Sequence, residues 1–144
     1  ERYKQSLSTN VYKCKTTYSL IMPKFDSILL IDDDEITNFI NHNLLEELQL
    51  ASKVIAISDA EEALTYLQDH SPSVIFLDLK MPVFDGFDFL EAFGKLSKFK
   101  KSDIQIIILT TSSNPKDVNR LAFFNFSKIL NKPLTKEKII EAIG

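Results

Sequence analysis

Three short runs made only of apolar residues constrain the fold of this chain more than any other feature. They read ILLI at residues 28–31, VIFL at 74–77 and IIIL at 106–109. Strands of this kind show no alternation of apolar and polar residues, which indicates that both of their faces are buried. A sheet buried on both faces needs helices on both sides, so the runs predict an α/β protein with a parallel sheet.

Segments with helical spacing separate these runs. In residues 35–48 the apolar positions 36, 39, 40, 44, 45 and 48 predict a helix, and Asp34 is a suitable N-cap. Ser58 or Asp59, Asn114 and Thr135 are the expected caps of later helices. The full prediction is strands at 27–31, 53–57, 74–77, 104–109 and 128–131, and helices at 35–48, 59–68, 87–97, 115–124 and 136–143. We therefore predict one (βα)5 domain over residues 25–144, with a doubly wound, five-stranded parallel sheet.

The first 24 residues differ from the rest in charge and pattern. They hold five basic residues and one acid, a net charge of +4, so the total of −3 leaves −7 for the remainder. We predict an extension over residues 1–24, in which 1–21 are a cloning remnant, an upstream translation or a loose segment before a natural start at Met22. An ordered extra strand or helix is the alternative. The acidic remainder argues against a nucleic-acid-binding surface, which needs Lys and Arg for phosphate contacts.

Composition excludes further classes of protein. No apolar run approaches the roughly 18 residues that a membrane span needs, and the first residues lack the apolar core of a signal peptide. Cys14 is the single cysteine, which excludes an intrachain disulfide and fits a cytoplasmic location. Zinc is not expected because the cysteine spacing is missing and the two histidines, His42 and His70, stand far apart on predicted helix surfaces.

Polar residues follow the predicted strands at the edge where ligands bind in open α/β sheets. They are Asp32 and Asp33, Asp78, Thr110 with Thr111, and Lys132. Taken singly, the acids could be solvated loop residues and the lysine a surface residue. Together, carboxylates without His or Cys suit a hard cation, Mg²⁺ or Mn²⁺. The lysine would neutralise part of the acid cluster or pair with an anionic ligand, which predicts phosphoryl transfer.

Four segments resemble the receiver domains of two-component response regulators, the CheY-like family. They read LLIDDDEI at 29–36, VIFLDLKMPVFDG at 74–86, IIILTTSS at 106–113 and ILNKPLT at 129–135. One segment alone is weak, but all four in this order at strand ends are specific, and the resemblance covers about residues 25–144. It implies a signalling protein, not a metabolic enzyme, that catalyses its own phosphorylation and dephosphorylation.

The resemblance implies a role for each matching residue. Asp78 would accept a phosphoryl group from a sensor histidine kinase or phosphotransfer protein, and would also contact the Mg²⁺ ion. Asp33 would bind the ion directly, Asp32 through a water, and Lys80 through its backbone carbonyl. Thr110 would hydrogen-bond the phosphoryl group and carry the switch, while Lys132 would pair with the phosphate.

Other residues depart from the family pattern or have structural explanations. Ile129 stands where the family often has Tyr or Phe, and Thr111 where a smaller residue is common. Asp34 and the pair Asp85-Gly86 are interpreted as helix starts. One alternative is a phosphatase of the haloacid-dehalogenase type, but that class usually has an acid where this chain has Lys80. Another is a receiver-like module that is never phosphorylated, which the complete acid set disfavours.

The end of the chain suggests how a signal would leave. Because the sequence ends with the last predicted helix, we expect output through a partner protein or a homodimer. Phe123, Phe124 and Phe126 are more aromatic residues than one helix stripe needs. An exposed one would form an apolar patch of the kind that marks a partner site, whereas burial of all three is the alternative. The resemblance places output on the surface of the last two helices and the strand between them.

Overall fold

The computed structural model describes residues 22–97, 103–111 and 114–144. Within them, one parallel sheet has the strand order β2-β1-β3-β4-β5. The strands are β1 Phe25–Ile31, β2 Ala51–Ile57, β3 Val74–Asp78, β4 Gln105–Thr110 and β5 Lys128–Asn131. The helices are α2 Glu35–Leu48, α3 Ala60–Asp69, α4 Gly86–Gly94, α6 Pro115–Leu121 and α7 Lys136–Ile143. The predicted (βα)5 doubly wound architecture is confirmed.

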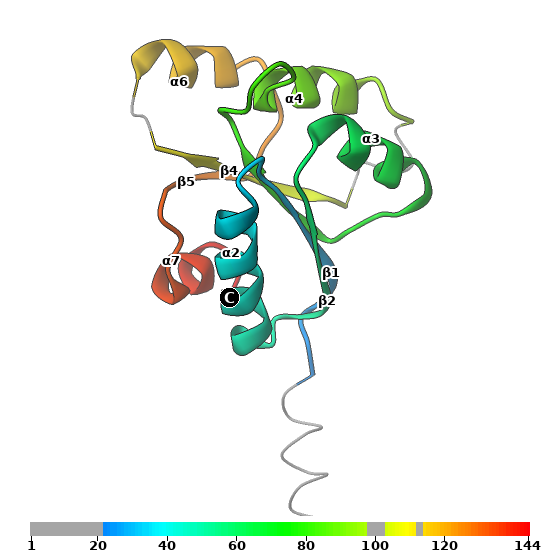
Figure 1. Ribbon diagram of the computed structural model, residues 1–144, viewed down its shortest axis with the longest axis vertical. Coiled ribbons are helices and arrows are strands. Elements are labelled where there is room, and N and C mark those ends of the chain that lie inside the picture. The colour runs from blue at the N-terminus through cyan, green and yellow to red at the C-terminus, as the bar shows by residue number, and fades with distance from the viewer. Residues whose placement is uncertain (1–21, 98–102, 112–113) are drawn as a thin grey trace, which may run out of the picture.

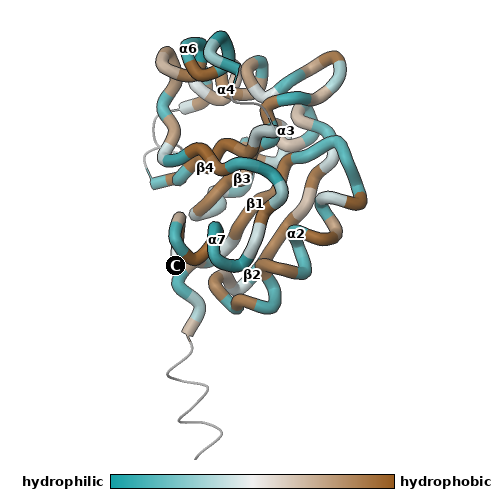
Figure 2. Tube along the Cα trace, turned by 90° about the vertical axis from the view of Figure 1, so that its left-hand side faces the viewer, coloured by the Kyte–Doolittle hydropathy of each residue, from teal (hydrophilic) through white to brown (hydrophobic). Residues whose placement is uncertain are grey.

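Helices cover both faces of the sheet (Figure 1). Residues of α2 and α7 pack on one face against Ile28, Leu30 and Phe76. Residues of α3, α4 and α6 pack on the other face against a second set of strand residues. The apolar strands lie in the middle of the molecule, as the colouring by hydropathy shows (Figure 2). Every residue of β3 is buried, whereas β5 lies at the edge of the sheet and is mostly exposed.

The predicted helix caps are confirmed. Asp34 accepts hydrogen bonds from the backbone N–H groups of Ile36 and Thr37. Of the two candidates before α3, Asp59 is the cap, and Asn114 and Thr135 cap α6 and α7. Asp85 starts α4 with a reciprocal pair of hydrogen bonds to Asp88, as its interpretation as a helix start required.

Several boundaries differ from the prediction. Strands β1 and β2 each begin two residues earlier than predicted, because Phe25 pairs with Ala51. The polar residues that follow each of them had suggested a later start. Helix α4 ends at Gly94 instead of 97, and α6 ends at Leu121 instead of 124. After α6 the chain turns, with the Phe124 N–H 2.9 Å from the Leu121 carbonyl oxygen. Phe124, three residues after the buried Leu121, packs partly against the core.

The three phenylalanines are not all buried, so that alternative is wrong. Phe124 and Phe126 pack partly against the core, whereas 88% of Phe123 is exposed. Residues 1–21 with Cys14, the middle of the 95–103 connection and Ser112 lie outside the described residues. Lys24, at the end of the predicted extension, donates to the carbonyl oxygens of Ile143 and Gly144, while the boundary at residue 25 stays a prediction. No helix in the described ranges is long and apolar enough to cross a membrane.

Candidate phosphoacceptor site

Strand register brings the predicted site residues to one edge of the sheet. Ile31 pairs with Leu77, so the residues that follow them, Asp32 and Asp78, leave adjacent strands at the same level. Asp78 itself pairs with Leu109, the residue before Thr110. The Lys132 N–H donates to the Thr110 carbonyl oxygen at 2.9 Å, which ties the end of β5 to the end of β4.

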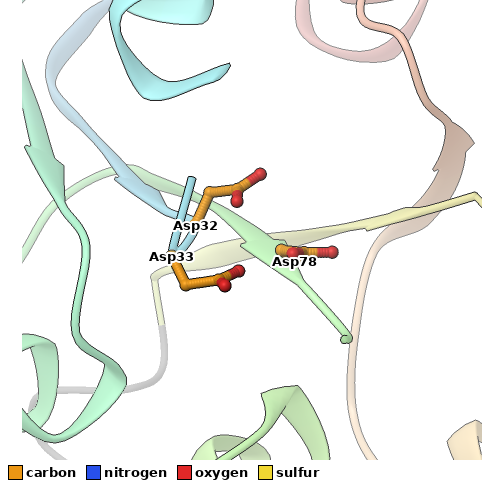
Figure 3. A group of neighbouring side chains, drawn as sticks. All are labelled: Asp32, Asp33 and Asp78. Carbon is orange, nitrogen blue, oxygen red and sulfur yellow. The ribbon is translucent and has the colours of Figure 1, made fainter. Parts of the chain in front are cut away.

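The carboxylates of Asp32, Asp33 and Asp78 form one group. Each offers an oxygen atom, and these atoms all lie within 4.8 Å of one another. In Figure 3 the side chains come from the ends of β1 and β3 and direct their carboxylates into the same space. Asp32 and Asp78 are buried, with 2% and 5% of their surface exposed, whereas Asp33 is exposed. The group therefore has a closed side within the protein and an open side toward solvent.

Lys132 holds the buried pair of acids together. Its Nζ atom lies 2.6 Å from Asp32 Oδ2 and 3.3 Å from Asp78 Oδ2. Burial alone would lower the pKa of Lys132, but the hydrogen bond to Asp32 and the charge of Asp78 raise it above the usual value. The ammonium group therefore stays charged and offsets part of the repulsion between the acids.

The pKa of the Asp78 carboxyl group lies above its usual value. Burial is the main cause and the negative charge of Asp32 adds to it, so the pKa of Asp78 rises to about 6 although Lys132 opposes the shift. A carboxyl group with this pKa is mostly ionised at neutral pH and can act as a nucleophile there. A cation close to Asp32 and Asp78 would also relieve the repulsion that contributes to the shift.

The donor set fits a hard divalent cation. It consists of carboxylate oxygens, the ligands that Mg²⁺ and Mn²⁺ prefer, and it includes neither His nor Cys. Lys80 exposes its side chain and directs its backbone N–H toward Asp78 Oδ1 at 3.4 Å. Of the histidines, His42 lies on α2 beside the Val54 carbonyl and His70 stacks on Tyr66 at the end of α3, so neither belongs to this group.

Gly86 allows the residues around Asp78 to pack closely. A Cβ atom added at Gly86 would lie 2.6 Å from the Asp78 carbonyl oxygen and 2.7 Å from the Leu79 Cα. Both neighbours are backbone atoms, so they have little freedom to move away. The Gly86 N–H also donates to the Leu79 carbonyl oxygen at 2.9 Å, which fixes the start of α4 against the end of β3.

The other predicted residues take distinct places. Thr110 is buried at the end of β4, and Thr111, the next residue, is exposed. Asp34 points to the start of α2, where hydrogen bonds from the Thr37 backbone, the Thr37 hydroxyl and the Ile36 backbone lower its pKa. The sequence reasoning missed Asn38, a buried polar residue beside the acid turn, although its place on a predicted helix next to apolar positions could have drawn attention to it.

Comparisons with known proteins agree with this geometry. The family model of the response regulator receiver domain matches residues 28–144. The chain belongs to the response regulator receiver family. Receiver domains are signalling modules of two-component systems, which also include histidine kinases and output proteins.

Three similar proteins illustrate the relationship. The probable C4-dicarboxylate response regulator DctR of Halalkalibacterium halodurans is 28% identical over 116 residues, which cover 81% of this chain and 49% of DctR. The chain thus spans about half the length of that relative. The probable chemotaxis protein CheY of Rhizobium etli is 28% identical over 81% of this chain and 88% of its own length. The crystal structure of a two component response regulator from Cytophaga hutchinsonii is 26% identical, with a TM-score of 0.75 over 83% of this chain and 94% of that chain.

Proposed function

We propose that this receiver domain accepts a phosphoryl group on Asp78 from a phosphorylated histidine of a kinase or phosphotransfer protein, with bound Mg²⁺. The observation that carries the proposal is the group of three carboxylates within 4.8 Å, with the Lys132 ammonium 3.3 Å from Asp78. Gathering acids in this way is unfavourable for stability because their charges repel. The arrangement supports binding of a cation together with an anionic group, and Mn²⁺ would suit the same oxygen ligands.

Asp78 performs the transfer. One of its oxygens attacks the phosphorus atom, and the P–N bond of the donor breaks as the O–P bond forms, returning its electron pair to the imidazole. Lys132 moves its charge from the acids to an oxygen of the phosphoryl group, and Thr110 donates its hydroxyl hydrogen to another. Lys132 follows β5 and Thr110 ends β4. Both strands lie on the opposite side of β3 from β1, so these two residues meet the phosphoryl group from the side away from Asp32 and Asp33.

Three groups of this chain would hold the cation directly. They are the carboxylates of Asp33 and Asp78 and the backbone carbonyl of Lys80, while Asp32 acts through a water molecule. When bound, the cation supplies positive charge that stabilises the phosphoryl oxygens during transfer. Asp32 remains on the buried side of the site, where its carboxylate accepts a hydrogen bond from the Asp34 N–H.

Substitution of the acceptor tests the proposal. Asp78→Asn replaces the nucleophile with an amide of nearly the same shape, so labelling by acetyl phosphate or a phosphorylated kinase should be lost. Asp85→Asn is the matched control, because Asn still caps α4 and the residue lies outside the acid group. Full labelling of Asp78→Asn, or equal loss in both variants, would reject Asp78 as the acceptor.

The signal would leave through the surface of α6, β5 and α7, reaching an output protein or a second copy of the chain. On this surface 88% of Phe123, 48% of Val118 and 52% of Ile140 are exposed. Thr110 ends the strand that pairs with β5, so its movement toward a phosphoryl group would act on this surface directly. Phosphorylation would thus change affinity for the partner by favouring one of two arrangements of the surface.

A further inference from the structure

Asn38 is a buried polar residue in the second turn of α2. Only 5% of its surface is exposed, and its side-chain Nδ2 donates a buried hydrogen bond of 2.8 Å to the backbone carbonyl oxygen of Asp32. Its backbone N–H donates to the Asp34 carbonyl oxygen at 3.0 Å. One residue therefore binds the backbone on both sides of Asp33.

Packing does not account for this choice of side chain. In the part of the chain that the structure describes, Asn38 Oδ1 is the one buried side-chain oxygen or nitrogen without a hydrogen-bond partner. A buried acceptor without a partner is destabilising, and an apolar side chain of similar size would avoid that penalty. The Oδ1 atom of the amide is thus unfavourable for stability, whereas its Nδ2 atom holds the Asp32 carbonyl.

The acid turn needs such support at Asp33. The Asp32 carboxylate is held by Lys132 and by the Asp34 N–H, which donates to Asp32 Oδ1 at 2.9 Å. The Asp34 carboxylate is held by the start of α2. Asp33 differs, because among the described residues no hydrogen bond or ion pair reaches its carboxylate. The position of that carboxylate follows from the backbone of the turn, which Asn38 fixes.

We propose that Asn38 is a positioning residue for the cation site and sets the direction of the Asp33 carboxylate through the backbone of residues 32–34. This inference rests on the proposed function, since it requires that Asp33 binds a cation. Groups that orient metal ligands typically account for 10–100-fold in metal affinity. Loss of the Asn38 amide should therefore weaken Mg²⁺ binding at least about tenfold.

The experiment compares two leucine substitutions on one helix. Asn38→Leu keeps the approximate volume and removes the donor. Asn41→Leu makes the same change at a residue that is also 5% exposed but has no hydrogen bond to the acid turn. Titration calorimetry with MgCl₂ gives the affinity of each protein, and thermal unfolding without Mg²⁺ gives the stability. The rate of labelling by acetyl phosphate is then measured against Mg²⁺ concentration.

Asn38→Leu should bind Mg²⁺ about tenfold more weakly or worse. Its melting temperature without Mg²⁺ should change little, because removal of the unpartnered Oδ1 offsets loss of the hydrogen bond to the Asp32 carbonyl. Its labelling should recover at saturating Mg²⁺, a shift in half-saturation that a general packing defect would not produce. Asn41→Leu should match the wild type. Asn38→Ala serves as a second variant in case leucine is too bulky.

Three results would overturn the inference in different ways. Unchanged Mg²⁺ affinity in Asn38→Leu, or equal weakening in Asn41→Leu, would reject the positioning role and leave the proposed function intact. Loss of the fold in both Asn38 variants would show that Asn38 is needed for folding and would reject its specific role in positioning Asp33. Absence of Mg²⁺ binding in the wild-type protein would reject the cation site itself, and the inference with it.

Discussion

The acid turn at residues 32–34 and the segment from α6 to β5 are built in opposite ways. In the turn, short hydrogen bonds from Asn38, Lys132 and neighbouring N–H groups hold nearly every polar group. The second region includes a seven-residue helix and a four-residue edge strand, and it exposes Phe123, Val118 and Ile129. A site that binds an ion gains from rigid ligands, whereas a surface that changes partners gains from loosely held elements.

The largest expected effect is the gain in stability on Mg²⁺ binding, which depends on the acid turn and not on the segment from α6 to β5. An ion that binds only the folded state at a hundred times its Kd stabilises the protein by about 2.7 kcal/mol. Asp33→Ala should lose this gain because it removes a ligand. Asp34→Ala should keep the gain while lowering the baseline, because it removes only the cap of α2. Thermal unfolding at increasing MgCl₂ measures both, and equal responses in the two variants would contradict the assigned ligands.

Much of this contrast could be predicted from the sequence, because local rules govern the first region. Apolar runs located the central strands, and Asp34 met the requirements of a helix cap. The strand ends also indicated which acids would meet, since parallel strands direct their carboxyl ends to one edge. The hydrogen bond from Asn38 to the Asp32 carbonyl could not be predicted, because it depends on how α2 lies against β1.

The second region was less predictable because long-range packing decides it. Helical spacing continued through Phe124, but the helix ends at Leu121 and the chain turns there, with Phe124 packed partly against the core. Sequence alone left open which of three phenylalanines would be exposed. The structure exposes Phe123, whereas Phe124 packs partly against the core. The comparison therefore also separates features that local propensity determines from features that tertiary contacts determine.

The two neighbouring phenylalanines offer a second test. Phe124 packs on the core, with its ring centroid 6.3 Å from that of Phe87, so Phe124→Ala should cost about 2 kcal/mol of unfolding free energy. Phe123→Ala, at a position that is 88% exposed, should change it by less than about 0.5 kcal/mol. Urea unfolding of both variants makes the measurement. Equal costs would mean that Phe123 is covered in solution, for example by a second copy of the chain.

The pH dependence of stability tests whether the buried charge of Asp78 destabilises the folded protein. Burial and then Asp32 raise its folded-state pKa to about 6, so between about pH 4 and pH 6 the folded protein binds more protons than the unfolded chain. Stability from this group is therefore present below pH 4 and is lost as pH rises through 6. Asp78→Asn removes the charged form and should stabilise the protein by on the order of 1–2 kcal/mol at pH 7.5 without Mg²⁺.

Urea unfolding in EDTA at pH 4 and pH 7.5 makes this measurement. The advantage of Asp78→Asn should shrink at the lower pH, and millimolar Mg²⁺ at pH 7.5 should narrow it in favour of the wild type. Asp85→Asn, which leaves the acid group intact, controls for general effects of an amide. A difference that is the same at both pH values would show that the charge of Asp78 is not the source of the destabilisation.

The smallest expected effect concerns communication between the two regions. Beryllofluoride, which mimics a phosphoryl group on Asp78, should alter amide hydrogen exchange in residues 114–131 and 136–143 and leave residues 35–48 nearly unchanged. The reason is connectivity, since Thr110 pairs with Asn131 and its carbonyl accepts from the Lys132 N–H. A coupling free energy of about 1 kcal/mol would appear as roughly a fivefold change in affinity for a partner or in self-association.

Phe123→Ala distinguishes a conformational change in the surface of α6, β5 and α7 from binding of a partner to that surface. The variant should keep the change in hydrogen exchange, because Phe123 makes little contact with the core, and should lose the change in self-association measured by analytical ultracentrifugation. Beryllofluoride binding, checked separately, must equal that of the wild type. If exchange and mass both stay constant while the mimic is bound, then the signal leaves elsewhere. The exposed apolar residues of α6 and β5 would in that case need an explanation unrelated to output.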